Sequence, residues 1–217
     1  MIKLYVDDAI SLVRKNMDEV DSGTAVMLVE PSATAMDEVI SRSIPEAVNI
    51  VNRKAPVSML EGVTIPNIRK ELVTLHGMYL TRLSPVSSLR LLRLKASDSD
   101  YIITTTVPAD SPEGRMQLNP HTCGRPDHPV VVEYPDGTYD YFSHDNNQGT
   151  VPTAYHMPVC ELEQGELYGV DVSPARKYYY VSAKVKEDII RMLTALVLTI
   201  YGQTDKAKIF MNAVGND

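Results

Sequence analysis

The segment from Ser182 to Tyr201 constrains the fold of this chain more than any other. Its apolar residues recur at spacings of three and four, which predicts a helix. The first half carries charged residues on one side, whereas the second half is apolar on nearly every side. A helix that is apolar all round must be covered all round, and we expect a second copy of the chain to supply part of that cover. The predicted oligomer interface comprises Tyr179 on a preceding strand and Val185, Ile189, Leu193, Leu196, Val197, Ile200 and Tyr201 on the helix.

Three further helices are predicted from the same periodicity. Residues 5–20 form one amphipathic pattern and residues 35–54 form a second. Pro45 interrupts the second pattern, so that this helix either kinks there or restarts after Ser43 as an N-cap. Gly202 is expected to end the Ser182 helix, and residues 205–213 are expected to form a short final helix.

The middle of the chain has the pattern of strands. Residues 89–94 and 101–107 are two β-rich runs around a polar turn, which indicates a hairpin. A second hairpin is predicted over 130–142, where Asp136-Gly137 forms the turn between two strands. The segment 57–88 is mixed, with a turn of helix at 66–71 and a strand at 73–83.

These elements predict an α+β fold in which N- and C-terminal helices form one bundle with an inserted β-rich lobe. The predicted parts are residues 1–88 for the N-terminal helical part, 89–175 for the insertion and 176–217 for the C-terminal helices. A continuous α+β domain is the alternative.

The formal net charge of −7 over 217 residues disfavours a general nucleic-acid binder, which needs a basic face to neutralise phosphates. The Lys and Arg residues are scattered, apart from a short run at Arg90, Arg93 and Lys95. A protein that lines a DNA channel can nevertheless be acidic. We expect no signal peptide, because the start of the chain has no basic stretch followed by an apolar one. We expect no membrane span either, because the most apolar run, from Met192 to Tyr201, is about half the length that a span needs.

A candidate metal site lies in the loop that contains His121, Cys123 and His128. Zinc binds such side chains, but the usual paired spacings of zinc ligands are absent here. The alternative interpretation of the chain is therefore a small metal-stabilised binding domain or a zinc-dependent hydrolase that uses this loop. The favoured interpretation has no metal, no cofactor and no catalytic residues, and it leaves Cys123 and Cys160 reduced.

Twelve tyrosines stand against two phenylalanines and no tryptophan. Tyr178, Tyr179 and Tyr180 follow one another, and in a strand the outer two share one face. Tyrosine suits interfaces, although the same rings can pack within the monomer. A weaker option is a carbohydrate-binding surface on the second predicted hairpin, made by Tyr134, Tyr139 and Tyr141.

The closing segment, from Val181 to Gly202 and then from Thr204 to Lys208, is a helix, a break and a shorter helix. Together with helices from Asp7 and from about Met36, this ending resembles the head–tail connector (adaptor) proteins of tailed bacteriophages. In general character the chain is similar to virion proteins of the crAss-like phages. Its β-rich insertion is larger than a minimal connector carries.

This resemblance implies a virion structural protein that forms a homo-oligomeric ring, a dodecamer, in the phage neck. The ring would join the portal protein to the tail, contact other neck and tail ring proteins, and let DNA pass through its lumen without sequence-specific binding. It would be made and assembled in the host cytoplasm and would act in the virion. Closing a ring requires a heterologous interface, in which two different faces of neighbouring subunits meet. Negative charge facing the lumen would repel the passing DNA.

Overall fold

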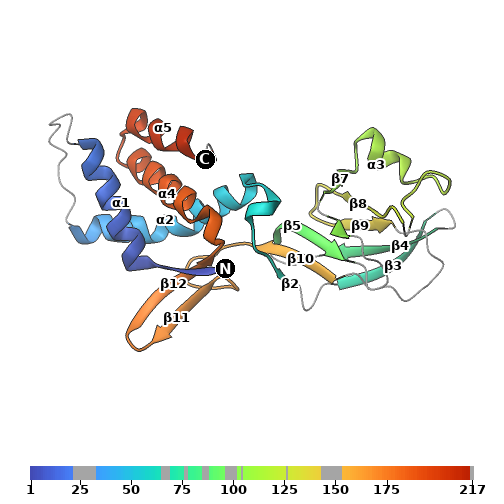
Figure 1. Cartoon of the computed structure of the whole chain (residues 1–217), viewed down its shortest axis with the longest axis horizontal. Helices are drawn as coiled ribbons and strands as arrows, with labels where there is room; N and C mark the ends of the chain where they lie inside the picture. Colours follow the sequence, from blue (N-terminus) through green and yellow to red (C-terminus); the bar gives the residue numbers. More distant parts are fainter. Residues whose placement is uncertain are drawn as a thin grey trace. The chain divides into compact units, whose positions relative to one another are not determined.

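The structure, a computed structural model, describes residues 1–21, 33–64, 69–75, 78–84, 88–95, 102–103, 105–125, 127–142 and 153–215. Helices lie at both ends of the chain and strands dominate its middle, which confirms the α+β class (Figure 1). The chain divides into two compact units. The helical unit comprises Met1–Glu61 and Val159–Asp217, and the strand unit comprises Gly62–Pro158.

The inserted unit therefore has other limits than the predicted 89–175. Residues 62–88 belong to it because the strands β3 (Arg69–Leu75) and β4 (Met78–Ser84) form one sheet with β9 (Tyr139–Phe142). Residues 159–175 belong to the helical unit because β11 (Tyr168–Val172) and β12 (Ala175–Val181) pair with β1 (Ile2–Tyr5). Pairing of β4 with β9 thus moves the first boundary, and pairing of β12 with β1 moves the second.

The four predicted helices are present as α1 (Val6–Asp21), α2 (Ala33–Lys54), α4 (Lys186–Ile200) and α5 (Thr204–Ala213). Pro45 lies inside one continuous α2, so the helix does not restart at Ser43. The Ser43 hydroxyl instead donates to the carbonyl of Val39 within the helix, at 2.9 Å. Ser182 is not a side-chain cap for α4 either, because its hydroxyl accepts from the backbone N–H of Glu61 at 2.7 Å.

The helix α4 is the core of the helical unit. It packs against α1, α2 and α5, and its side chains at Ile189, Leu193 and Val197 have no exposed surface. Gly202 takes a φ of +76° and ends the helical run, which lets α5 turn back along α4. The cover that this apolar helix requires thus comes largely from its own chain.

The helical unit also carries a three-stranded antiparallel sheet in the order β1-β12-β11. Leu4, Tyr179 and Val181 are buried on the side that faces the helices. The hairpin β11–β12 extends away from the helices (Figure 1).

The strand unit contains two sheets. The four-stranded sheet has the order β2 (Val63–Thr64), β10 (Thr153–Pro158), β5 (Ser88–Lys95), β6 (Ile102–Ile103), and the five-stranded sheet has the order β3-β4-β9-β8-β7, where β8 is Val130–Glu133 and β7 is Val107–Pro108. A short helix, α3 (Pro112–Met116), follows β7. The sheets meet through one hydrophobic cluster, which joins Leu91, Leu94 and Ala154 of the first to Leu83, Val131, Tyr139 and Tyr141 of the second.

The hairpin predicted over 130–142 is confirmed. The one predicted from residues 89–94 and 101–107 is confirmed in part, because β6 covers only Ile102–Ile103 and Val107 lies in β7 of the other sheet. The strands β5 and β6 pair antiparallel, and β8 pairs with β9 across the Asp136-Gly137 turn, where Gly137 has a φ of +79°. The predicted turn of helix at 66–71 is wrong for residues 69–71, which lie in β3, and residues 65–68 fall outside the described residues. The single strand predicted at 73–83 is two strands, β3 and β4, which pair with each other as a hairpin.

A buried ion pair links two strands of the larger sheet. Arg82 on β4 and Asp140 on β9 are cross-strand partners, and the guanidinium donates to both carboxylate oxygens at 2.7 and 2.8 Å. Asp140 has no exposed surface, whereas the Arg82 side chain is 38% exposed. Removing Arg82 therefore leaves a buried negative charge, whereas removing the charge of Asp140 leaves a positive charge that reaches water.

We expect Arg82→Met to destabilise the strand unit more than Asp140→Asn does. Arg82→Met leaves the buried Asp140 carboxylate without its ion-pair partner, at a cost of about 3–5 kcal/mol. Asp140→Asn leaves an arginine that reaches water and still has an acceptor, so we expect a loss of about 1–2 kcal/mol. Urea unfolding of both variants measures the difference, and equal losses would contradict this account.

Candidate assembly surface

The eight residues of the predicted oligomer interface do not share one environment. Tyr179, Val185, Ile189, Leu193 and Val197 are at most 1% exposed within the single chain. The structure corrects the prediction for these five, because α1, α2 and α5 pack around α4, and Tyr179 is buried on β12 beside the Tyr168 ring. An apolar pattern on all sides of a helix predicts that other segments bury it, and here segments of the same chain bury most of it.

The other three interface residues lie at the end of α4. Leu196 and Tyr201 are half-buried, and Ile200 is 59% exposed. On α5, which packs against α4, Ile209 is 61% exposed and Met211 is 40% exposed. We call Leu196, Ile200, Tyr201, Ile209 and Met211 the α4–α5 corner. Its role as an interface stays a prediction.

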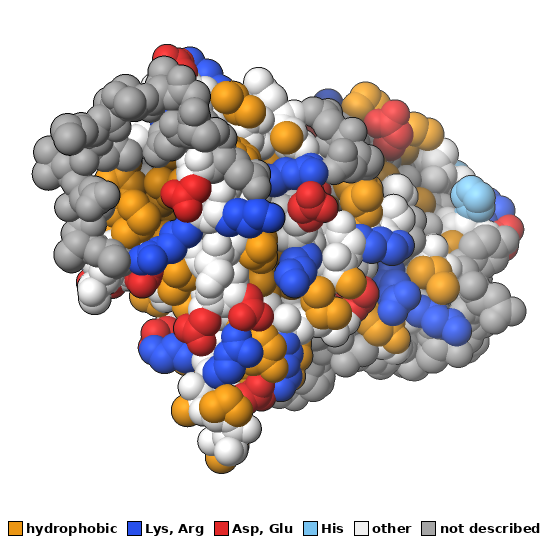
Figure 2. Space-filling view, turned by 60° about the vertical axis from the view of Figure 1, so that its left-hand side comes forward, with side chains coloured by type: hydrophobic (Ala, Val, Ile, Leu, Met, Phe, Trp, Pro, Cys, Tyr) orange, Lys and Arg blue, Asp and Glu red, His pale blue; other side chains and the backbone are white. Residues whose placement is uncertain are grey.

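A second surface lies on the side of the β1-β12-β11 sheet that is turned away from the helices. Cross-strand pairing joins Lys3 to Tyr180, Tyr5 to Tyr178 and Asp171 to Arg176, so these six side chains share one face. We call them the outer face. Charged and apolar side chains interleave on the lower part of the molecule in Figure 2, where this hairpin extends.

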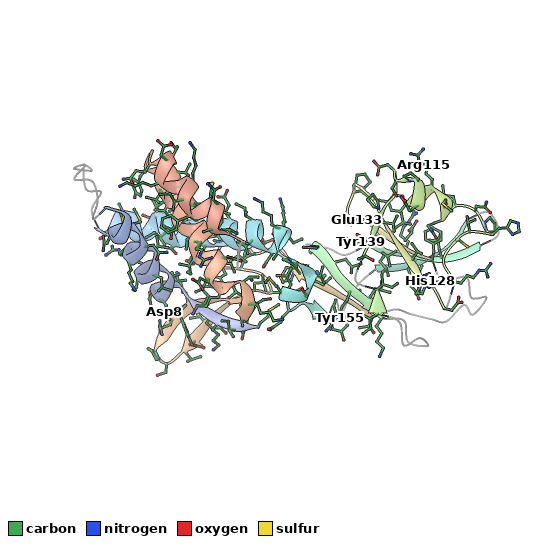
Figure 3. The ribbon with its side chains drawn as sticks, turned by 45° about the horizontal axis from the view of Figure 1, so that its top comes forward. Asp8, Arg115, His128, Glu133, Tyr139 and Tyr155 are labelled. Carbon is green, nitrogen blue, oxygen red and sulfur yellow. The ribbon has the colours of Figure 1, made fainter. Side chains whose placement is uncertain are left out.

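The charges of the outer face are paired with one another and with the start of α1. The Lys3 ammonium lies 2.5 Å from Asp171, whose second oxygen accepts from the Tyr5 hydroxyl at 2.8 Å. Arg176 reaches the carboxylate of Asp8 at 2.5 Å, and Figure 3 shows Asp8 at the beginning of α1. These contacts tie both edge strands of the sheet to each other and to the first helix.

Aromatic rings fill the space between these charges. The Lys3 ammonium lies 4.3 Å from the centroid of the Tyr178 ring, and the Arg176 guanidinium lies 4.0 Å from that of Tyr5. The Tyr178 ring also covers Gly169 on β11, where an added Cβ would come within 2.4 Å of the ring. As a result Tyr178 is only 8% exposed although it lies on the outward side of the sheet.

This arrangement gives the hairpin a fixed orientation on the helical unit. The opposite side of the hairpin carries exposed apolar residues, Val170 at 49% and Val172 at 95%. A rigid projection with an apolar tip suits contact with another protein better than catalysis. The alternation in the sequence predicts that Tyr178 and Tyr180 share one face, which β12 confirms. Sequence analysis missed the charged residues of the outer face, because Lys3 reaches it through the pairing of β1 with β12, from the other end of the chain.

The predicted metal ligands are not brought together. His121 and His128 are exposed, Cys123 is buried, and His144 lies outside the described residues. The described part of the chain contains no group of three or more His, Cys, Asp or Glu side chains placed to hold a metal ion.

The tyrosines and cysteines that the sequence analysis considered for binding or chemistry are mostly buried. Tyr139 and Tyr141 are at most 4% exposed, so the prediction that they form a carbohydrate-binding surface is wrong, and Tyr134 is half-buried. Cys123 and Cys160 are free and buried. The Asn49 side chain bonds both the N–H and the carbonyl of Cys160, which fixes the chain where it re-enters the helical unit. Among the described helices, none is long and apolar enough to cross a membrane.

The outer face should weaken in acid. The hydrogen bonds from Lys3 and Tyr5 hold the pKa of Asp171 below its ordinary value of 3.8. A carboxylate with a lowered pKa stabilises the fold above the unfolded-state value, and this is lost as the pH falls through the folded-state value. We expect Asp171→Asn to lower the thermal midpoint at neutral pH and the gap to wild type to close below pH 3.8. A gap that does not depend on pH would contradict this role.

Cys160 should resist thiol reagents in the folded protein. Burial, followed by the charge of Glu161, raises the pKa of its thiol to about 12, so that almost no thiolate forms at pH 8. We expect modification by iodoacetamide only after denaturant has opened the helical unit, which peptide mass spectrometry can follow. Rapid labelling of native Cys160 would contradict its buried position.

The sequence was compared with models of known protein families and with curated proteins. No family model matches the chain, and no curated protein matches it either. The likeness to phage connectors therefore stays a prediction that comes from the pattern of helices in the sequence.

Proposed function

We propose that this chain is a virion structural protein that forms a homo-oligomeric ring in the neck of a phage and joins the portal to the tail. The observation that carries the proposal is the helical unit, which both ends of the chain build around α4 and which ends in helix, Gly202 and shorter helix. This is the ending expected from the resemblance to connector proteins. The strand unit is then an insertion in a connector scaffold.

Two different surfaces of the helical unit support a ring rather than a symmetric dimer. The α4–α5 corner exposes apolar side chains, whereas the hairpin β11–β12 presents the paired charges of the outer face and an apolar tip. A ring closes through a heterologous interface, in which two unlike faces meet. In the proposed ring, the corner of one subunit contacts its neighbour.

The proposed role involves no catalysis and no cofactor. The partners are further copies of the chain, twelve in all as the resemblance implies, the portal protein and other neck and tail rings. In this proposal DNA passes through the lumen of the ring without sequence-specific binding. The alternative of a zinc site has less support, because Cys123 is buried while His121 and His128 are exposed.

Native mass spectrometry of the purified chain, alone and with the portal protein of the same phage, tests the proposal. We expect a ring in at least one of the two samples. The double variant Ile200→Glu/Ile209→Glu places charges on exposed positions of the corner, so we expect it to abolish the ring and leave the monomer folded.

Two controls separate assembly from folding. Leu118→Glu makes the same kind of change at an exposed position of the strand unit and should leave the ring intact. Leu193→Ala creates a cavity beside α4 and should cost about 2–5 kcal/mol of subunit stability. A chain that stays monomeric with portal present would overturn the proposal, and a ring unaffected by the double variant would remove the corner from the interface.

A further inference from the structure

The smaller sheet of the strand unit has an unusual charge pattern for this chain. Its four strands, β2, β10, β5 and β6, contain three charged residues, Arg90, Arg93 and Lys95, and all three are basic. No Asp or Glu falls within these strands, although the whole chain has 28 acidic against 21 basic residues. Positive charge is therefore concentrated on this sheet, although the protein as a whole has a net negative charge.

The register places two of these cations together on the outward side of the sheet. Leu94 and Ala154 are cross-strand partners and both point into the core between the sheets. Their neighbours point the other way because side chains alternate along a strand. Arg93 therefore lies opposite Tyr155 and Lys95 lies opposite Thr153, and both cations are exposed. We call Arg93, Lys95, Thr153 and Tyr155 the basic strip.

Arg93 is held in a defined orientation. Its guanidinium carbon lies 4.0 Å from the centroid of the Tyr155 ring, a stacking distance, and Figure 3 labels Tyr155 on β10. A stacked guanidinium keeps the N–H donors along its edge free for an acceptor from solution. Elsewhere in the described structure Lys3, Arg82 and Arg176 are bound to carboxylates. Within the described residues no carboxylate forms an ion pair with Arg93 or Lys95.

We propose that the basic strip binds the phosphate backbone of DNA. Arg93 and Lys95 are two residues apart on a strand, about 7 Å at the usual rise, which is close to the separation of successive phosphates along one DNA strand. Tyr and Thr hydroxyls beside them are further donors to phosphate oxygens. These contacts are to phosphate oxygens, which are the same for every base, so we expect the binding to be independent of sequence.

The affinity of one strip is low because few phosphates are neutralised. Two contacts, from Arg93 and Lys95, give a slope of log K against log salt of about −2. Several copies held together would bind far more tightly through multivalency. The inference does not depend on the proposed ring, because the strip belongs to a single chain.

Fluorescence anisotropy with a labelled duplex of about 20 base pairs, at about 20 and 100 mM NaCl, measures this binding in the purified full chain. We expect Arg93→Glu/Lys95→Glu to weaken binding by about tenfold or more and to flatten the salt slope. The matched control is Arg115→Glu/Arg125→Glu, which makes the same charge change at exposed positions of the same unit. An equal loss in both double variants would overturn the proposal, because only the net charge would then matter.

Two further arms test the chemistry of the strip. Tyr155→Phe keeps the ring beneath Arg93 and should retain most of the affinity, whereas Tyr155→Ala should lose it, with thermal midpoints reported for both. Poly-glutamate as a competitor distinguishes an acidic protein partner from DNA. Displacement of DNA by poly-glutamate at equal charge concentration would overturn the assignment to phosphate.

The outcome is separable from that of the proposed ring. A chain that stays monomeric but binds DNA through the strip retains this inference and loses the ring. A ring that does not bind DNA does the reverse.

Discussion

The burial of α4 by segments from both ends of the chain is the constraint on which the helical unit depends. The helix α4 presents apolar side chains on nearly every side, and α1, α2 and α5 each cover part of it. Because β1 and α1 come from the start of the chain and α4 from its end, the strand unit has to be accommodated between them. An insertion is the consequence of closing a core with the two ends of one chain.

The same burial changes how assembly has to be explained. An apolar helix that its own chain covers gives no reason for a second copy to bind, so an interface must lie on surface that remains. That surface is small on α4 itself, where Ile200 at the end of the helix is the large apolar side chain left exposed among the described residues. The remaining candidates are α5 and the β11–β12 hairpin, which contribute Ala207 and Tyr179 to the core and keep exposed side chains on their other sides. In the proposed ring, the contact surface would thus be separate from the buried faces of these elements.

Periodicity in the sequence predicts the helices and the two hairpins because each depends on residues close together in the chain. The extent of α1 and the break at Gly202 are local in this sense. The unit boundaries are not, since they depend on β12 pairing with β1 and on β4 pairing with β9. The interface prediction failed for Leu193 and its buried neighbours for the same reason, because periodicity shows that a face needs cover and not which segment supplies it.

The sequence likewise gives the net charge of the chain, whereas only the structure shows which charged side chains are paired. The composition gives a net charge of −7 and predicts no affinity for nucleic acid, yet an average over the chain hides where cations remain unpaired. On the outer face the structure pairs Lys3 and Arg176 with carboxylates, so their charges serve to fix the hairpin. Arg93 instead stacks on a neutral ring, and stacking orients a guanidinium without neutralising it. A cation that is oriented but not neutralised still attracts an anion outside the chain. The basic strip and the outer face have similar residue types, and this difference in neutralisation is why we propose different roles for them.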